Sequence, residues 1–334
     1  MGVGVTYRVL ITDHPAATVD VERAVLDSAG VELVVADATD PASLATLAAD
    51  VDAIATCFAK ITAGVLDNAP RCRTVARFGV GVDNIDVARA SELGIVVTNV
   101  PVYCTDEVAD HTLMLLLAVA RRLLPFAADT AAGGWNRTIA STPVRLRGKT
   151  FGAIGAGAIG TALTPRVKAL GMEMVTLRRH GDNAAGVRAV HSLDELLAVA
   201  DVVSLHLPLN PSTRHLIGSR ELDLMKSTSM LLNTSRGGLV DTAALTVALS
   251  EGRLAGAGLD VTEPEPLPAD HPLRAMANVV LTPHYAFSSD GSMADLSRTA
   301  AHHVLDVLTG RRPASVVNAE VLTSAALRTP ELAR

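Results

Sequence analysis

The chain has 334 residues, which is long enough for two domains that each bury a core. Apolar residues make up 49% of it and charged residues 19%, and the formal net charge of -6 disfavours a dedicated binder of nucleic acid or of an anionic membrane. The longest apolar run, residues 113–120, is far shorter than the ~20 residues that span a bilayer, and the N-terminus has no signal-peptide pattern. We therefore expect a cytoplasmic protein without a membrane or nucleic-acid partner.

Short apolar strands alternate with helical segments over the first 100 residues. We expect strands at residues 8–12, 31–36, 53–56, 75–77 and 96–98, and helices around 19–29 and 44–49. Such regular alternation predicts a parallel sheet with helices on both faces.

Residues 105–124 form a long helix candidate. Thr105 is suited to cap its start. Arg121 and Arg122 lie in its last turn, where the helix dipole favours cations. We expect this helix to be the first crossing between the two domains and the two arginines to be solvated. His111, on the same helix, is predicted to be a packing or interdomain residue rather than an acid.

A second alternating region begins near residue 149. We expect strands at residues 151–154, 174–177, 202–205, 229–233, 257–259 and 279–281. A last helix, about 292–309, is predicted to return to the first domain and to carry His302 and His303 on a solvated face. Pro165 falls inside the first helix of this region and predicts a kink or an early end there.

The segment 151–160 reads as a buried strand, a glycine turn and the start of a helix. Gly155, Gly157 and Gly160 form the pattern G-x-G-x-x-G, which is typical of a dinucleotide-binding βαβ unit. The first glycine makes a tight turn, the second lets backbone approach a pyrophosphate, and the third allows close packing of helix on strand. The pattern therefore predicts a nucleotide site in the second half of the chain.

Three polar side chains follow three of the expected strands of this region. They are Arg236, Glu265 and His284. Because ligands bind beyond the carboxyl ends of strands in open α/β sheets, we expect the three to converge on one crevice. A cation that polarises a carbonyl, a proton donor, and a carboxylate that orients the donor are what hydride transfer to a 2-oxo acid requires.

With these motifs the chain resembles the D-isomer-specific 2-hydroxyacid dehydrogenase family over nearly its whole length. The resemblance is carried by residues 77–86, the glycine turn, and residues 206–208, 233–241 and 258–266. Residues 107–112 and 284–288 look most like the branch that contains the C-terminal-binding proteins and their bacterial enzyme relatives.

The resemblance implies an α/β fold of two doubly wound parallel-sheet domains, one a Rossmann-type nucleotide domain and one a flavodoxin-like substrate domain, with an interdomain cleft. The substrate domain is expected to be discontinuous, comprising residues 1–100 and 285–334, and the nucleotide domain to comprise residues 101–284. A homodimer formed through the nucleotide domain is also implied.

The same resemblance assigns roles to individual residues. Arg236 would anchor and polarise the substrate, and His284 would be the acid/base, with Glu265 rather than the nearby Glu263 as its partner. Backbone amides of Val80 and Gly81 would hold the substrate carboxylate. The full substrate set is Phe78, Gly79, Val80, Gly81, Tyr103 and Arg236. Cofactor contacts are expected from Gly155, Gly157, Ala158, Ile159, Gly160, Arg178, Arg179, His206, Pro208, Thr213, Thr234, Ser235 and Asp260, the last near the nicotinamide carboxamide. No metal is expected.

One position departs from the pattern of NAD-specific relatives, whose second nucleotide-domain strand ends in an aspartate. Here the corresponding segment ends in Arg178 and Arg179. Two guanidinium groups suit a ribose 2′-phosphate, so the sequence favours NADP over NAD. The alternative is an arginine that stacks on adenine in an enzyme that accepts either cofactor.

The expected activity is the interconversion of a small 2-oxo acid and its D-2-hydroxy acid with NAD(P). Two alternatives remain open. The same scaffold would permit oxidation of another oxyanion, such as phosphite. A nucleotide-sensing, corepressor-like binding protein with little turnover is the other alternative, and the intact catalytic set disfavours it.

Overall fold

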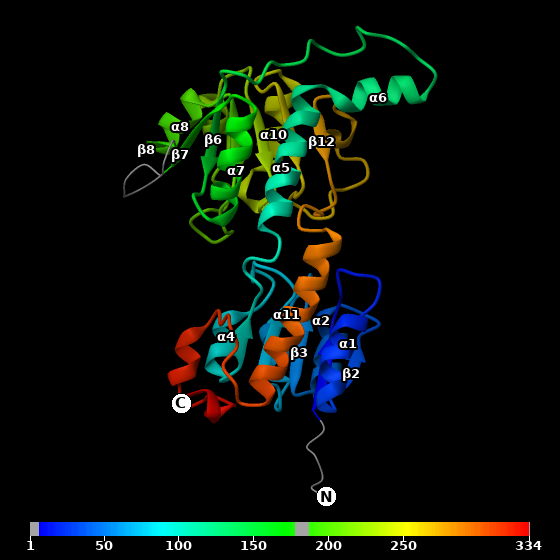
Figure 1. Cartoon of the computed structure of the whole chain (residues 1–334), viewed down its shortest axis with the longest axis vertical. Coiled ribbons are helices and arrows are strands. Elements are labelled where there is room, and N and C mark those ends of the chain that lie inside the picture. Colours follow the sequence, from blue (N-terminus) through cyan, green and yellow to red (C-terminus); the bar gives the residue numbers. More distant parts are fainter. Residues whose placement is uncertain (1–6, 178–186, 334) are drawn as a thin grey trace, which may run out of the picture. The chain divides into compact units, whose positions relative to one another are not determined.

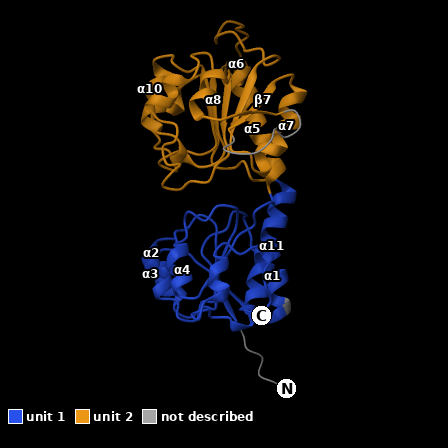
Figure 2. Ribbon diagram, turned by 90° about the vertical axis from the view of Figure 1, so that its left-hand side faces the viewer, with its two compact units in different colours: residues 1–103, 289–334 blue, residues 104–288 orange. Residues whose placement is uncertain are grey.

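The computed structural model describes residues 7–177 and 187–333, and the chain divides into two compact units (Figures 1 and 2). Unit 1 comprises residues 1–103 and 289–334, and unit 2 comprises residues 104–288. Unit 1 is therefore built from two separate segments of the chain.

Unit 1 contains a parallel five-stranded sheet in the order β2-β1-β3-β4-β5. The strand order reverses between β1 and β3, as in flavodoxin-like doubly wound folds. The strands are β1 (Arg8–Ile11), β2 (Glu32–Val35), β3 (Ala53–Thr56), β4 (Thr74–Arg77) and β5 (Val96–Thr98). The helices are α1 (Asp20–Leu26), α2 (Pro41–Ala48), α3 (Ala63–Asp67), α4 (Val87–Glu92) and α11 (Asp290–Leu308).

Helices cover both faces of this sheet, which is why its central strands β3 and β4 are buried along their whole length. All four residues of β3 are buried. One core cluster joins Leu26 of α1 and Val304 of α11 to the sheet, and a second joins Leu44 of α2 and Leu66 of α3 to the other face.

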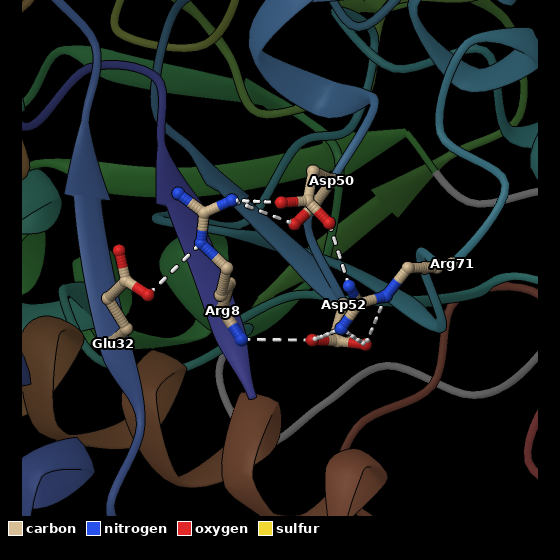
Figure 3. A network of polar contacts seen from close by, with 5 residues as sticks. All are labelled: Arg8, Glu32, Asp50, Asp52 and Arg71. Atoms are coloured by element: carbon tan, nitrogen blue, oxygen red, sulfur yellow. Dashed lines mark hydrogen bonds and ion pairs between the residues drawn. The ribbon is translucent and has the colours of Figure 1, made fainter. Parts of the chain in front are cut away.

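A network of charged side chains lies at the amino ends of the strands of unit 1 (Figure 3). Arg8 pairs with Glu32 at 3.1 Å and also with Asp50, while Arg71 lies 2.7 Å from Asp50 and 2.9 Å from Asp52. Asp52 accepts the backbone N–H of Arg8 at 2.9 Å and therefore links β1 to the turn before β3. Because ligands bind at the carboxyl ends of such sheets, we interpret this network as structural.

Unit 2 contains a parallel seven-stranded sheet in the order β12-β11-β10-β9-β6-β7-β8. Its order reverses between β6 and β9, as in a Rossmann fold extended by one strand. The strands are β6 (Thr150–Ile154), β7 (Glu173–Leu177), β8 (Arg188–Val190), β9 (Val202–Leu205), β10 (Met230–Asn233), β11 (Gly256–Leu259) and β12 (Val279–Leu281). The helices are α5 (Thr105–Ala120), α6 (Leu123–Ala131), α7 (Ala158–Ala169), α8 (Leu193–Val199), α9 (Ser219–Leu224) and α10 (Thr242–Ser250).

The two faces of this sheet carry separate cores. Leu231 points into a cluster with α8, α9 and α10, and its neighbours Met230 and Leu232 point into the opposite cluster, with α5 and α7. In that second cluster Leu115 of α5 and Leu163 of α7 are fully buried. Helix α5 thereby lies against the strands whose ends carry the candidate site.

The single helix expected over residues 105–124 is instead two helices, α5 and α6, bent by 71°. A helix that continued unbroken would bring the ring of Pro125 against the carbonyl of Arg121, whereas Pro125 in the first turn of a new helix is tolerated. Arg122 joins the two helices with φ of 55°. No single helix among the described residues is long and apolar enough to cross a membrane, although this bent pair meets that test jointly.

Two smaller expectations were also wrong, and one of the two alternatives at Pro165 is excluded. Arg122 is buried rather than solvated, and its guanidinium donates to the carbonyl of Ala255 at 3.2 Å. His303 is buried on α11, with only His302 exposed. Helix α7 does not end early at Pro165 but continues to Ala169, because buried Leu163 and Val167 hold it against the sheet, and the alternative of a kink at Pro165 stays a prediction.

Candidate active site

The glycine turn lies where the strand order of unit 2 reverses. Gly155 has φ of 115°, and a Cβ added there would overlap the carbonyl oxygen of His206, at the end of β9. A Cβ on Gly160 would lie 2.5 Å from the carbonyl oxygen of Gly155. A Cβ on Gly157, by contrast, would meet nothing within 4 Å. The turn is thus packed at its first and third glycines and open at its second, where a ligand would approach.

Helix α7 begins at this open turn. The first N–H groups of any α-helix have no intrahelical acceptor, and here those of Ala158 and Ile159 also lack a side-chain cap, because the N-cap is Gly157. Such a terminus binds anions well. A cavity of about 200 Å³ adjoins the turn and is lined in part by Gly155, Gly160 and Thr176. These features fit the pyrophosphate and ribose of a dinucleotide.

The loop after β9 carries three of the expected cofactor residues. His206 lies 2.9 Å through Nε2 from the hydroxyl of Ser204, and burial lowers the pKa of His206 to about 4, so its ring is neutral at pH 7. Thr213 closes the loop, since its hydroxyl donates to the carbonyl of Pro208 at 2.8 Å and accepts the N–H of Asn210 at 2.9 Å.

The loop after β10 carries Arg236. Asn233, the last residue of β10, donates to the carbonyl of Arg236 at 2.8 Å and accepts the N–H of Ser235 at 3.1 Å. The Ser235 hydroxyl donates to the carbonyl of Leu205 at 2.6 Å, and buried Thr234 lies 2.9 Å from the hydroxyl of Thr112 on α5. The loop that presents Arg236 is therefore held by hydrogen bonds within itself, to the end of β9 and to helix α5.

The loops after β11 and β12 bring Glu265 and His284 together. Glu265 Oε1 lies 2.5 Å from His284 Nδ1, and the side chains are 39% and 20% exposed. Glu263 is engaged elsewhere, with Arg214 and His215 each at 2.8 Å. The hydrogen bond from His215, with the charge and hydrogen bond of Arg214, holds the pKa of Glu263 below its ordinary value. Of the two glutamates, Glu265 is therefore the one that pairs with His284.

Asp260, at the end of β11, is buried beneath the loop that carries His284. Its carboxylate accepts the hydroxyl of Thr282 at 2.5 Å and the backbone N–H groups of Tyr285 and Ala286, each at 2.9 Å. The side chain is 1% exposed. Its carboxylate is therefore occupied by protein donors, and the expected contact with a nicotinamide carboxamide stays a prediction.

His111 joins this network from helix α5. Its Nε2 lies 2.9 Å from Thr282 Oγ1 and 3.4 Å from Asp260 Oδ1. The sequence offered no sign of this link, because the three residues are separated by more than 20 positions and no short motif contains them. The expectation that His111 is a packing residue did not anticipate its polar partners.

The residues expected to bind substrate in unit 1 follow β4, except Tyr103, which follows β5. Phe78 is 1% exposed, and its N–H donates to the carbonyl of Thr56 at 2.8 Å. Gly79 has φ of 143°, and a Cβ there would overlap the guanidinium of Arg77. Val80 is 44% exposed, and within the described chain the N–H groups of Val80 and Gly81 donate to no protein acceptor. Tyr103 is half-buried.

Two expected cofactor residues fall in the segment between β7 and β8. Arg178 and Arg179 lie outside the described residues, immediately after β7, which ends at Leu177. The cofactor preference inferred from them therefore rests on the sequence.

Known proteins are similar to this chain over most of its length. The family model described as D-isomer specific 2-hydroxyacid dehydrogenase, NAD binding domain, matches residues 113–286. Glyoxylate reductase of Aeropyrum pernix is 42% identical over 291 residues, which cover 84% of this chain and 87% of that protein.

Solved structures are also similar to this chain over most of its length. The TT0316 protein of Thermus thermophilus superposes with a TM-score of 0.85 at 39% identity, covering 93% of this chain and 99% of that one. NADPH-dependent glyoxylate/hydroxypyruvate reductase of Sinorhizobium meliloti, in complex with NADP and malonate, has a TM-score of 0.84 at 31% identity, covering 97% and 98%. The chain therefore belongs to the D-isomer-specific 2-hydroxyacid dehydrogenase family and is an NAD(P)-dependent enzyme.

Proposed function

We propose that this enzyme reduces a small 2-oxo acid to its D-2-hydroxy acid, with glyoxylate as the first candidate substrate. The observation that carries the proposal is the His284–Glu265 pair at 2.5 Å, on loops next to the loop of Arg236. Strands β10, β11 and β12 are neighbours in the sheet, so the three side chains leave it at one edge. The glyoxylate reductases at 40–42% identity support the choice of substrate.

Each group has a chemical task in this proposal. The amides of Val80 and Gly81 bind the substrate carboxylate, and Arg236 draws electron density onto the carbonyl oxygen. Glu265 engages Nδ1 of His284 and thereby assigns proton transfer to Nε2, which protonates the developing alkoxide. When bound at the glycine turn, the nicotinamide cofactor supplies the hydride.

We further propose a preference for NADP(H). No carboxylate stands at residues 174–180, where a ribose 2′-hydroxyl would be recognised, and Arg178 and Arg179 supply charge for a 2′-phosphate. We expect Arg178→Ser and Arg179→Ser to raise the KM for NADPH by about tenfold and to leave the KM for NADH nearly unchanged. A lower KM for NADH than for NADPH in the unaltered enzyme would contradict the preference.

A homodimer through unit 2 completes the proposal. Helix α6 has no buried residue although it carries Leu123 and Leu124, which are 53% and 46% exposed. Trp135, just beyond α6, is 79% exposed. An apolar helix face of this kind is commonly covered by a second subunit. Light scattering on the unaltered protein and on Leu123→Asp would test this: a dimer that dissociates supports it, and a monomeric unaltered protein contradicts it.

Turnover by the purified protein tests the activity. Glyoxylate, hydroxypyruvate and pyruvate would be assayed with NADPH and NADH, and phosphite with the oxidised cofactors. We expect the highest kcat/KM with glyoxylate and NADPH. Cofactor reduction by phosphite alone would favour the oxyanion alternative, and tight cofactor binding without any turnover would favour a nucleotide sensor.

A further inference from the structure

Two adjacent residues of helix α5 reach the loops that carry the proposed catalytic groups. Thr112 contacts Thr234, in the loop of Arg236, at 2.9 Å. His111 contacts Thr282, in the loop of His284, at 2.9 Å. The second contact is the more informative, because it continues through Thr282 to the buried carboxylate of Asp260 at 2.5 Å.

His111, Thr282 and Asp260 form a series of hydrogen bonds, and the carboxylate at its end sets the direction of each bond. The hydroxyl of Thr282 donates its single proton to Asp260 Oδ1, which also accepts the backbone N–H of Tyr285. The oxygen of Thr282 then accepts from His111, whose Nε2 must carry a proton. Burial lowers the pKa of His111, with the charge of Asp260 opposing, so the ring is a neutral Nε2–H donor at pH 7.

Asp260, at the other end of this series of hydrogen bonds, holds the backbone of the loop that carries His284. Asp260 accepts the N–H groups of Tyr285 and Ala286 through Oδ1 and Oδ2, and its own carbonyl accepts the N–H of His284 at 2.7 Å. His284 has φ of 54°, a left-handed conformation that is unfavourable for a residue with a Cβ and persists only where its surroundings enforce it. The Asp260 carboxylate supplies that enforcement on the side of residues 285 and 286.

We propose that His111 is a positioning residue for His284, acting through Thr282 and Asp260. It fixes the hydroxyl of Thr282, which orients the Asp260 carboxylate, which in turn holds the loop in the conformation that pairs His284 with Glu265. The role in turnover rests on the function proposed above, whereas the geometric role does not. His111 does not touch the reacting atoms in this scheme.

Matched substitutions separate positioning from packing. Thr282→Val keeps the shape of the side chain and removes its hydroxyl, whereas Thr282→Ser keeps the hydroxyl. His111→Leu removes the donor, whereas His111→Gln retains an N–H donor at a similar distance. We expect Thr282→Val and His111→Leu each to lower kcat for glyoxylate by about 10–100-fold, because a small misplacement of a catalytic group has an effect of this size. Thr282→Ser and His111→Gln should restore kcat to within about threefold of the unaltered enzyme.

The cofactor should bind with an unchanged Kd in all four variants, measured by quenching of protein fluorescence. A rise of tenfold in that Kd with an unchanged kcat at saturation would overturn the proposal, since the network would then serve the cofactor. A folded His111→Leu or Thr282→Val with unchanged kcat would also overturn it.

A readout without turnover distinguishes this inference from the proposed activity. In the protein labelled with 15N-histidine, the Nδ1–H resonance of His284 reports its bond to Glu265. We expect that resonance to shift or broaden in His111→Leu and Thr282→Val and to return in His111→Gln and Thr282→Ser. An unshifted resonance in the first two would overturn the positioning role, even if the protein proved inactive toward every 2-oxo acid.

Discussion

Each unit of the molecule has a histidine paired with a glutamate at the carboxyl side of its sheet, and the two pairs differ mainly in exposure. His284 and Glu265 in unit 2 lie 2.5 Å apart with side chains 20% and 39% exposed. His14 and Glu22 in unit 1 lie 2.6 Å apart with side chains 7% and 2% exposed. A pair that transfers protons to a substrate must be reachable by it, so the exposed pair fits the catalytic role proposed for it and the buried pair fits a structural role.

The buried pair fastens helix α1 to the loop after β1. Glu22 lies on α1, and His14 also meets the ring of Phe78 edge-on at 5.0 Å. Burial alone would lower the pKa of His14, but the hydrogen bond and charge of Glu22 outweigh it and raise that pKa. Burial alone would likewise raise the pKa of Glu22, but the hydrogen bonds of His14 and Ser297, together with the charge of His14, outweigh it and lower that pKa. Both shifts favour the ion pair.

The largest effect should come from replacing the exposed histidine. His284→Gln removes the proton donor, and we expect kcat for glyoxylate to fall by about 10²–10⁴-fold with little change in the melting temperature. His14→Gln, the matched change in the buried pair, should leave kcat within about threefold and lower the free energy of unfolding by about 2 kcal/mol. Steady-state kinetics and denaturant unfolding of both variants measure these changes in kcat and in stability. Equal losses of kcat in the two variants would contradict a catalytic role for the exposed pair alone.

The partner glutamate gives the next effect. Glu265→Gln keeps the size of the side chain and removes the charge that orients His284, so kcat should fall by about 100-fold. Glu263→Gln, two residues away, breaks only exposed contacts with Arg214 and His215 and should change kcat by less than about fivefold. A larger loss in the second variant than in the first would show that the catalytic carboxylate has been misassigned.

The glycine turn extends the contrast between open and packed positions. Gly157→Ala places a methyl group in open space on the side from which the pyrophosphate approaches, so we expect the Kd of NADPH to rise about tenfold with stability retained. Gly160→Ala puts a methyl group against the carbonyl of Gly155 and should lower the melting temperature. Isothermal titration and thermal unfolding separate the two, and unchanged NADPH binding by Gly157→Ala would count against the site.

The smallest effect is the pH dependence of the buried pair. Because the pKa of His14 is raised on folding, its contribution to stability is fully present below its unfolded pKa, near 6.5, and is lost as the pH rises through the folded value. The advantage of the unaltered protein over His14→Gln in unfolding free energy should therefore shrink between about pH 6 and pH 9. An advantage that grows with pH would mean that His14 is neutral in the folded protein.

The parallel architecture could be predicted from the sequence because strand and helix patterns alternate so regularly. Six of the seven strands of unit 2 were expected near their observed positions, and the exception, β8, is a three-residue strand at the sheet edge. The reversal of strand order follows from the glycine turn after β6, since the G-x-G-x-x-G pattern marks the first strand of a Rossmann sheet.

What the sequence could not reveal depends on contacts between distant residues. Burial of Arg122 and His303 is decided by the parts of the chain that pack over them, such as the Ala255 carbonyl over Arg122, and not by the sequence around them. The same holds for His111, whose partners Thr282 and Asp260 lie at least 149 positions away and meet it only when α5 packs on the sheet. Helical periodicity places such residues on a face but does not identify the groups opposite them.

A crystal structure with NADPH and oxamate, a non-reducible analogue of glyoxylate, tests the central claim most directly. We expect the guanidinium of Arg236 and Nε2 of His284 to lie within hydrogen-bonding distance of the same ligand oxygen, with Nδ1 of His284 still on Glu265. An analogue bound elsewhere, or an imidazole turned away from it with the Glu265 pairing intact, would contradict the assignment of the exposed pair as the acid/base.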